Sequence, residues 1–181
     1  MVTQVPADAL AVTIDGVRGH LAQADRPVAT ARAEARVVDG FRTEVAVRGH
    51  TLAVDQSAPL GDDTGPTPVE LLLASLASCQ QALIAIHARV LGVPLASVTV
   101  TVTVTVTVEG DYDPRGVFGV GNLPGGMSRI ASTVDIRSAA TPAEIARLVE
   151  TVDRHCPVLA ALQRPFPVQQ AYTLNGRVAG D

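Results

Sequence analysis

The chain has 181 residues, of which 47% are hydrophobic, and this is enough for one domain with a sizeable core. Its formal net charge is −4 and no run of lysine or arginine occurs, so neither nucleic acid nor an anionic membrane surface is an expected partner. The N-terminus lacks a basic region followed by an apolar block, which favours a cytoplasmic location. In that reducing compartment, the two cysteines are expected to be free, redox-active or metal-binding rather than a structural disulfide.

We expect a single domain over residues 1–181 that begins with a short extension. Within this extension, residues 1–28, a helix is predicted over residues 6–24, although two glycines inside it lower its helix propensity. Asp25-Arg26-Pro27 is expected to end the helix.

Three strands are predicted after the extension. Residues 29–37 alternate between small apolar residues and charged or hydroxyl residues, which indicates a half-exposed strand. Asp39-Gly40 is typical of a hairpin turn, so residues 41–47 are the expected return strand. After a break at Gly49-His50, residues 51–54 are expected to form the third strand, and a loop rich in Asp, Gly and Pro follows.

The longest apolar stretch predicts a central, buried helix. Thr67 is placed to cap it, Pro68 occupies the first helical position, and Glu70 completes a capping box. No charged residue occurs between positions 71 and 88, and a helix that is apolar on all sides is buried in a core or crosses a membrane. Serines, glutamines and a histidine interrupt the run, so a membrane span is not expected. The helix is expected to end near Gly92-Val93-Pro94.

The next part of the chain predicts two strands. Residues 98–109 are almost entirely alternating Val and Thr, which is the clearest strand pattern in the chain. Exposed at an edge, this strand would promote aggregation, so we expect it inside a sheet. Residues 110–126 are expected to form a turn-rich loop before a further strand at residues 130–136.

The C-terminal part predicts two helices and a last strand. Thr141 and Glu144 form a second capping box, and the helix behind it is interrupted at His155-Cys156-Pro157. A short helix is expected over residues 158–162 and a strand over residues 167–174. The mixture of separate strands and helices indicates an α+β fold.

The two cysteines differ in their local surroundings. Cys156 is expected at the N-terminus of the short helix beside Arg154 and His155, and both the helix dipole and nearby cations favour a thiolate. Cys79 lies in the middle of the central helix, where burial alone would raise the pKa of its thiol. The alternative is that both residues are small buried hydrophobes. Together with His87, these side chains also suggest zinc, but no close ligand pair such as Cys-x-x-Cys occurs, so neither a metal nor a cofactor is expected.

The segment from Pro68 through Leu71 to Cys79, the distant Cys156-Pro157-Val158 and the order of the elements resemble the OsmC/Ohr family of hydroperoxide reductases. The resemblance covers roughly residues 29–175. It implies antiparallel sheets wrapped around long buried central helices in an intertwined homodimer, with the active site at the subunit interface. It also implies that Cys79 attacks the peroxide and becomes a sulfenic acid, which Cys156 resolves as a disulfide. A lipoyl group or a small dithiol would then act as reductant.

Two positions depart from the peroxidases of this family. They carry a glutamate directly after the proline of the motif, where this chain has Val69 followed by Glu70. They also carry an arginine before the first hairpin turn, and the corresponding place here lies near Val38, flanked by Arg36 and Arg42. In the family this arginine holds the cysteine as a thiolate. Glu70, Arg36 and Arg42 are therefore accessory candidates.

His50 is the remaining accessory candidate. The stretch from Gly49 to Asp55 resembles a less characterised OsmC-like branch, in which a histidine near the cysteine could act as cation or base in place of the arginine. An exposed strand histidine without any role is the alternative.

The resemblance and the departures from it lead to two expected functions. The first is a thiol-dependent reductase of organic hydroperoxides, since the apolar surroundings of Cys79 suit a fatty or aromatic hydroperoxide better than hydrogen peroxide. The second is a non-catalytic OsmC-like protein that binds a small apolar ligand or senses oxidation, which the missing arginine and glutamate favour.

Overall fold

The computed structural model describes residues 7–25, 29–95, 103–164, 166–175 and 177–178. Its helices are α1 (Ala7–Gln23), α2 (Pro68–Leu91), α3 (Pro114–Val117), α4 (Pro142–His155) and α5 (Pro157–Gln163). Its strands are β1 (Glu34–Asp39), β2 (Arg42–Val47), β3 (His50–Val54), β4 (Thr103–Tyr112), β5 (Met127–Arg137), β6 (Thr173–Leu174) and β7 (Arg177–Val178). The described sheets are antiparallel, so the predicted α+β class is confirmed.

The central helix α2 begins and ends where the sequence predicts. The Thr67 hydroxyl accepts the Glu70 backbone N–H, and the Glu70 carboxylate accepts the Thr67 backbone N–H at 2.7 Å. At the other end, Gly92 adopts φ 69°, a left-handed conformation that a side chain would strain. Its N–H bonds the carbonyl groups of the last helical turn and stops the helix.

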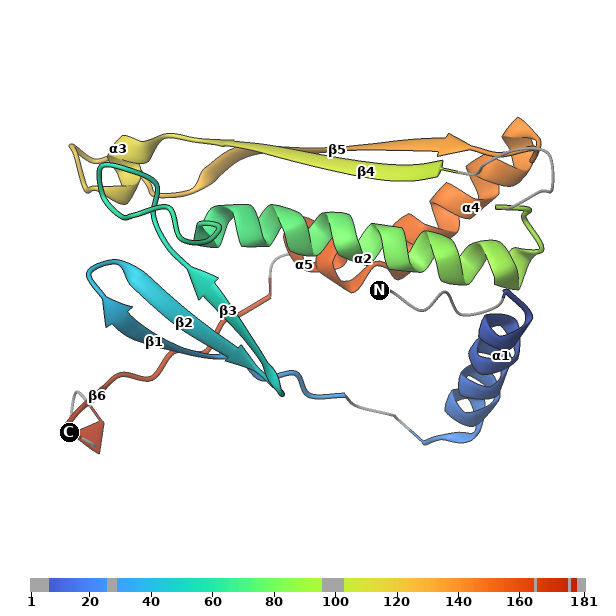
Figure 1. Cartoon of the computed structure of the whole chain (residues 1–181), viewed down its shortest axis with the longest axis horizontal. Coiled ribbons are helices and arrows are strands. Elements are labelled where there is room, and N and C mark those ends of the chain that lie inside the picture. The colour runs from blue at the N-terminus through green and yellow to red at the C-terminus, as the bar shows by residue number, and fades with distance from the viewer. Residues whose placement is uncertain (1–6, 26–28, 96–102, 165, 176, 179–181) are drawn as a thin grey trace.

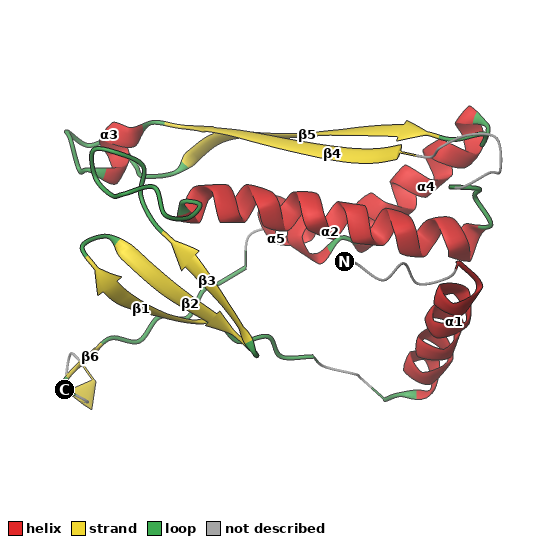
Figure 2. Cartoon of the chain, viewed as in Figure 1, coloured by secondary structure: helices red, strands yellow, loops and turns green. Residues whose placement is uncertain are grey.

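Helix α2 lies between two sheets (Figures 1 and 2). The β4–β5 ribbon runs along one side of it, α4 and α5 pack against it, and the β1–β2–β3 sheet lies on the other side. The core is formed where α2 meets α4 and contains Ile84, Ala88, Val93, Leu148 and Val152. A single stripe of α2, with one residue per turn, is therefore buried in this chain.

The expectation that α2 is buried on all sides is wrong for a single chain. Leu72 and Ile86 on its outer face are exposed by more than a third of their surface. By length and composition α2 could also cross a membrane. However, it packs along its length against β4, α4 and α5, as the central helix of a folded domain does.

The first sheet is shorter than predicted at its start. Residues 29–33 are not strand. β1 begins at Glu34 opposite Ala46, and β2 ends one residue further on at Val47, so residues 29–32 have no β2 residue opposite them. All six β1 residues are exposed, so the predicted division into a covered and an open face is not present in one chain. The hairpin turn at Asp39-Gly40 and the third strand are confirmed.

The loop from β3 to α2 is held by a buried carboxylate. Asp55 accepts backbone N–H groups of Gln56, Asp62 and Thr64 and the Thr64 hydroxyl, at 2.8 to 3.3 Å. These bonds, led by the Gln56 N–H, lower the pKa of this carboxyl. Further along, Gly65 runs so close to the sheet that a Cβ there would clash with the Ala53 carbonyl.

The Val-Thr segment forms β4, with two differences from the prediction. The strand continues to Tyr112, and residues 98–102 of the predicted strand lie outside the described residues. Among the described residues β4 pairs only with β5, so it borders a two-stranded ribbon rather than lying inside a sheet. The predicted loop of residues 110–126 also contains the short helix α3, and β5 is longer than the predicted strand of residues 130–136.

The C-terminal helices are confirmed and the last strand is not. Thr141 and Glu144 form the predicted capping box of α4, and Pro157 begins α5. Of residues 167–174, only Thr173 and Leu174 are strand, paired in a hairpin with β7. The other described residues of that segment lack a ladder partner in this chain, and an apolar, strand-like sequence alone does not provide one.

Candidate functional site

The structure brings together two thiols that are 77 positions apart in the sequence. The Sγ atoms of Cys79 and Cys156 lie 3.3 Å apart, and both cysteines are free. Cys79 comes from the middle of α2, and Cys156 from the junction of α4 and α5. A disulfide has an S–S length near 2.0 Å, so a small local movement is enough to form the bond. The expectation that the two cysteines meet is confirmed.

The junction of α4 and α5 fixes the position of Cys156. Pro157 has no N–H and fits the first position of α5, so the chain ends one helix and begins another at this point. Cys156 is the N-cap of α5, and its sulfur accepts the Leu159 backbone N–H at 3.4 Å. Its side chain is fully buried, whereas Cys79 is half-buried. Only Cys79 therefore presents surface to solvent.

Burial raises the pKa of the Cys79 thiol, and the neighbouring Cys156 raises it further. The Val158 backbone N–H, in the first turn of α5, acts in the opposite direction and lowers the pKa of this thiol. No cationic side chain of the described residues contributes to this balance. Within the part of the chain that the structure describes, the first turn of α5 is thus the group that favours a Cys79 thiolate.

The two side chains expected to act as cations beside Cys156, those of Arg154 and His155, contact other residues instead. Arg154 forms an ion pair with Glu150 at 2.7 Å, one turn back on α4. His155 stacks on His87 of α2 with ring centroids 5.3 Å apart. Among the described residues, no group of three or more His, Cys, Asp or Glu side chains is arranged to hold a metal ion.

The accessory candidates do not join the thiols. Glu70 serves the capping box of α2, nine positions and therefore about 13 Å of helix from Cys79. Arg36 forms an ion pair with Glu44 across the β1–β2 ladder at 2.9 Å. Arg42 begins β2, and His50 is exposed at the start of β3. These three lie on the first sheet, whereas the main packing partners of α2 in this chain are β4, α4 and α5.

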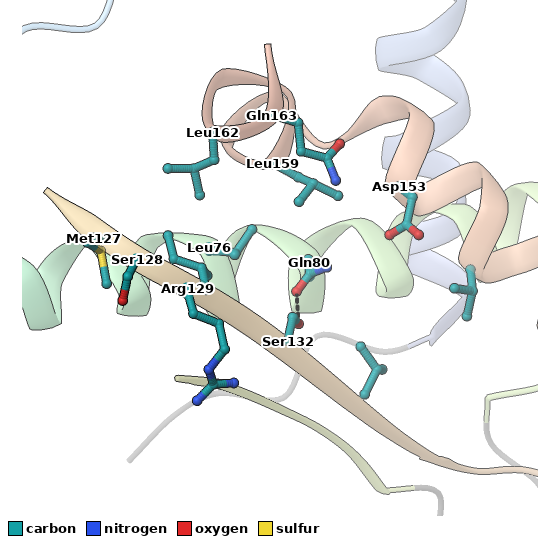
Figure 3. Close-up of a pocket in the computed structure, with 13 residues that line it drawn as sticks. Leu76, Gln80, Met127, Ser128, Arg129, Ser132, Asp153, Leu159, Leu162 and Gln163 are labelled. Atoms are coloured by element: carbon teal, nitrogen blue, oxygen red, sulfur yellow. Dashed lines mark hydrogen bonds between the residues drawn. The ribbon is translucent and has the colours of Figure 1, made fainter. Parts of the chain in front are cut away.

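A groove beside the thiol pair is not predicted by any pattern in the sequence. It has a volume of about 690 Å³ and lies between α2, β5, α4 and α5 (Figure 3). Gln80, the residue after Cys79, borders it, and the side-chain oxygen of Gln80 accepts the Ser132 hydroxyl at 2.6 Å. One signal could have found Gln80: it shares the four-residue spacing of Leu76 and Ile84, the buried stripe of α2.

A long helix between antiparallel sheets, with two free thiols meeting at its centre, places the chain in a class of α+β thiol proteins. The family model described as OsmC-like protein matches residues 61–170, and the chain belongs to this family. The resemblance drawn from the sequence is therefore confirmed.

Solved structures show the same fold at low sequence identity. An OsmC-like protein from Mycoplasma pneumoniae matches with a TM-score of 0.64 and 18% identity, over 77% of this chain and 91% of that one. An organic hydroperoxide resistance protein from Elizabethkingia anophelis matches with a TM-score of 0.55 and 18% identity, over 78% and 93%. An organic hydroperoxide resistance protein from Legionella pneumophila matches with a TM-score of 0.53 and 20% identity, over 77% of this chain and 93% of that one. No curated protein sequence matches the chain.

Proposed function

We propose that this protein reduces organic hydroperoxides with its two thiols. The observation that carries the proposal is the 3.3 Å separation of the Cys79 and Cys156 sulfur atoms. Membership of the OsmC-like family supports it, as do fold relatives named organic hydroperoxide resistance proteins. A cytoplasmic homodimer with a dithiol or lipoyl reductant belongs to the same proposal.

The reaction has three balanced steps. The Cys79 thiolate attacks the terminal oxygen of the hydroperoxide, the O–O bond breaks, and the alkoxide takes up a proton and leaves as an alcohol. The Cys156 thiol then attacks the resulting sulfenic acid, which forms the disulfide and releases water. A dithiol finally reduces the disulfide to two thiols and is itself oxidised.

The difference in exposure supports these roles. A peroxide in solution can reach the half-buried Cys79, whereas Cys156 is fully buried behind it. The sulfur of Cys156 lies within reach of the Cys79 sulfur and can resolve a sulfenic acid formed there. The raised pKa of Cys79 predicts slow attack at neutral pH and faster attack as pH rises toward that pKa, because the thiolate is the nucleophile.

The test is thiol counting during a single turnover. One equivalent of cumene hydroperoxide should consume both thiols of the reduced protein and give an intramolecular disulfide. The Cys156→Ser variant should lose one thiol and stop at a sulfenic acid that dimedone traps. The Cys79→Ser variant should not react.

The two single variants are matched controls for each other, because each keeps one thiol. If Cys156 reacts first, the roles are reversed. If neither thiol reacts with cumene hydroperoxide, the reductase proposal fails.

A second function, binding of a small apolar ligand, is favoured by two observations. Cys79 has a raised pKa with no described cation beside it, which disfavours fast thiol chemistry. The groove between α2 and β5 has aliphatic side chains from α2, β5, α4 and α5 in its lining. Binding of an unreactive apolar compound by the reduced protein, with no thiol loss, would separate this function from the first.

A further inference from the structure

The groove of Figure 3 has the size and lining of a small-molecule site. Its volume of about 690 Å³ falls inside the range of roughly 300–1,000 Å³ that ligand pockets occupy. Neither cysteine lines it. Its apolar surface comes from the four elements α2, β5, α4 and α5 and includes Leu76, Ile130, Val134, Val149, Leu159 and Leu162.

One buried polar side chain faces this apolar surface. Gln80 is only 4% exposed, and its side-chain oxygen is occupied by the Ser132 hydroxyl. Among the described residues, no buried side-chain nitrogen or oxygen lacks a hydrogen-bond partner. The Gln80 amide nitrogen has no hydrogen-bond partner within the described part of the chain, so it is not one of these enclosed atoms. Because Gln80 borders the groove, this nitrogen is accessible from it. It can donate a hydrogen bond to a molecule lying there.

The charges around the groove disfavour an anion. Arg129 at one end is already bound by the Asp111 carboxylate at 2.6 Å. Glu109 lies 3.9 Å from the same guanidinium. Asp153 adds a carboxylate to the lining (Figure 3). A ligand with a free carboxylate would therefore meet more negative than positive charge.

We propose that this groove binds a neutral, mainly aliphatic molecule with an ester or ketone carbonyl, and that Gln80 donates a hydrogen bond to that carbonyl. The inference rests on the ligand-binding function proposed above and does not require the thiol reaction. It makes Gln80 a specificity-determining residue: the aliphatic lining supplies affinity, and the amide selects an acceptor group.

Binding of methyl decanoate and of decanoate to the reduced, ¹⁵N-labelled full chain tests the proposal. Methyl decanoate should shift the Gln80 side-chain amide resonances, and decanoate should bind more weakly. Gln80→Met, which keeps the length of the side chain, should weaken ester binding roughly three- to ten-fold, as expected for one hydrogen bond. Gln81→Met is the matched control, because Gln81 is exposed on the same helix, and it should leave ester binding unchanged.

Three results would overturn the inference. Ester affinity that Gln80→Met leaves unchanged would remove the role of the amide. Decanoate binding as tightly as its methyl ester would remove the charge argument. Ester binding that leaves the Gln80 amide resonances unshifted would place the ligand elsewhere, and this readout does not depend on the folding of any variant. If the wild-type protein binds no ester at all, the ligand-binding function fails as well, while the thiol test remains independent.

Discussion

The helical layer and the first sheet of this protein differ in how completely one chain buries them. In the layer of α2, α4 and α5, side chains such as Leu148 and Ile84 are at most 1% exposed. In the β1–β2–β3 sheet, every residue of β1 is exposed, and Val37 keeps 72% of its surface. Isolated small sheets need a covered apolar face to be stable. The helical layer therefore buries a core within the chain, whereas the sheet leaves β1 uncovered.

This difference explains why the two cysteines meet within one chain, whereas the accessory candidates on the first sheet do not lie beside them. Cys79 and Cys156 belong to elements that pack on each other inside one chain. Arg36, Arg42 and His50 lie on the sheet that lacks a cover. We expect a second copy to supply that cover, as the family resemblance implies, and its sheet could then approach these thiols.

The largest expected effect concerns assembly. Light scattering at micromolar concentration should give twice the chain mass of 18.7 kDa. Val37→Asp, which places a charge on the exposed apolar side chain of β1, should shift the protein toward the single-chain mass. Glu34→Asp on the same strand is the control and should remain assembled. A stable, folded single chain in the wild type would contradict the expectation that a second copy covers this sheet.

The next effect concerns the helical layer. Leu148→Ala removes a fully buried side chain of the core and should lower the free energy of unfolding by about 2–5 kcal/mol. Arg36→Ala, on the open sheet, should cost at most about 1 kcal/mol, because it removes an exposed ion pair. Chemical denaturation of both variants measures the contrast. Equal losses would show that the sheet is as well packed as the core.

The caps of the helical layer should give a smaller effect. Thr67→Ala and Thr141→Ala each remove an N-cap acceptor and should each cost about 1 kcal/mol of unfolding free energy. Glu70→Gln should be mild, because glutamine also completes a capping box. Thermal denaturation checks these values. Loss of cumene hydroperoxide turnover in Glu70→Gln at an unchanged melting temperature would assign Glu70 a role beyond capping.

The smallest effect is a pH dependence at the end of the helical layer. Burial, followed by His155 and the charge of Arg18, lowers the pKa of His87. The unfolded chain, with a histidine pKa near 6.5, then binds a proton more readily than the folded chain. Stability should therefore be unaffected above about pH 6.5 and fall as the pH decreases toward the lowered pKa.

His87→Phe keeps an aromatic ring against His155 and removes this titration. Denaturation midpoints at about pH 7.5 and about pH 5.5 should differ less in this variant than in the wild type. His20→Phe, on α1, is the control and should keep the wild-type difference, since no contact of His20 with this pair is among the described interactions. An identical pH dependence in His87→Phe and wild type would contradict the prediction.

The sequence predicted the helices better than the strands, for a physical reason. The limits of α2 and α4 depend on local residues, Thr67 with Glu70 and Thr141 with Glu144, and both capping boxes are present. The extents of β1 and β6 depend on which strands lie beside them, and pairing between distant segments is not encoded locally.

The candidate site divides in the same way. Meeting of Cys79 and Cys156 was predicted from the family resemblance, because no local pattern links residues 77 positions apart. The direction of the Cys79 pKa followed from burial alone, and the structure agrees. The prediction of cationic surroundings for Cys156 is wrong, because Arg154 forms an ion pair with Glu150 and His155 stacks on His87. Glu150 lies one turn back on α4 and His87 lies on α2, so the residues next to Cys156 in the sequence do not predict these contacts.

The 77-position separation of Cys79 and Cys156 in the sequence also links their oxidation to the thermodynamic stability of the fold. A bond between them would close a chain loop of that length and, by the entropy of the unfolded state, would stabilise the fold by roughly 4.5 kcal/mol. The effect is reciprocal: the disulfide raises the free energy of unfolding, and folding by the same amount makes the disulfide harder to reduce than it is in the unfolded chain. The oxidised chain would then resist thermal unfolding and proteolysis better than the reduced chain. Reaction with a peroxide would therefore lengthen the lifetime of the protein molecule.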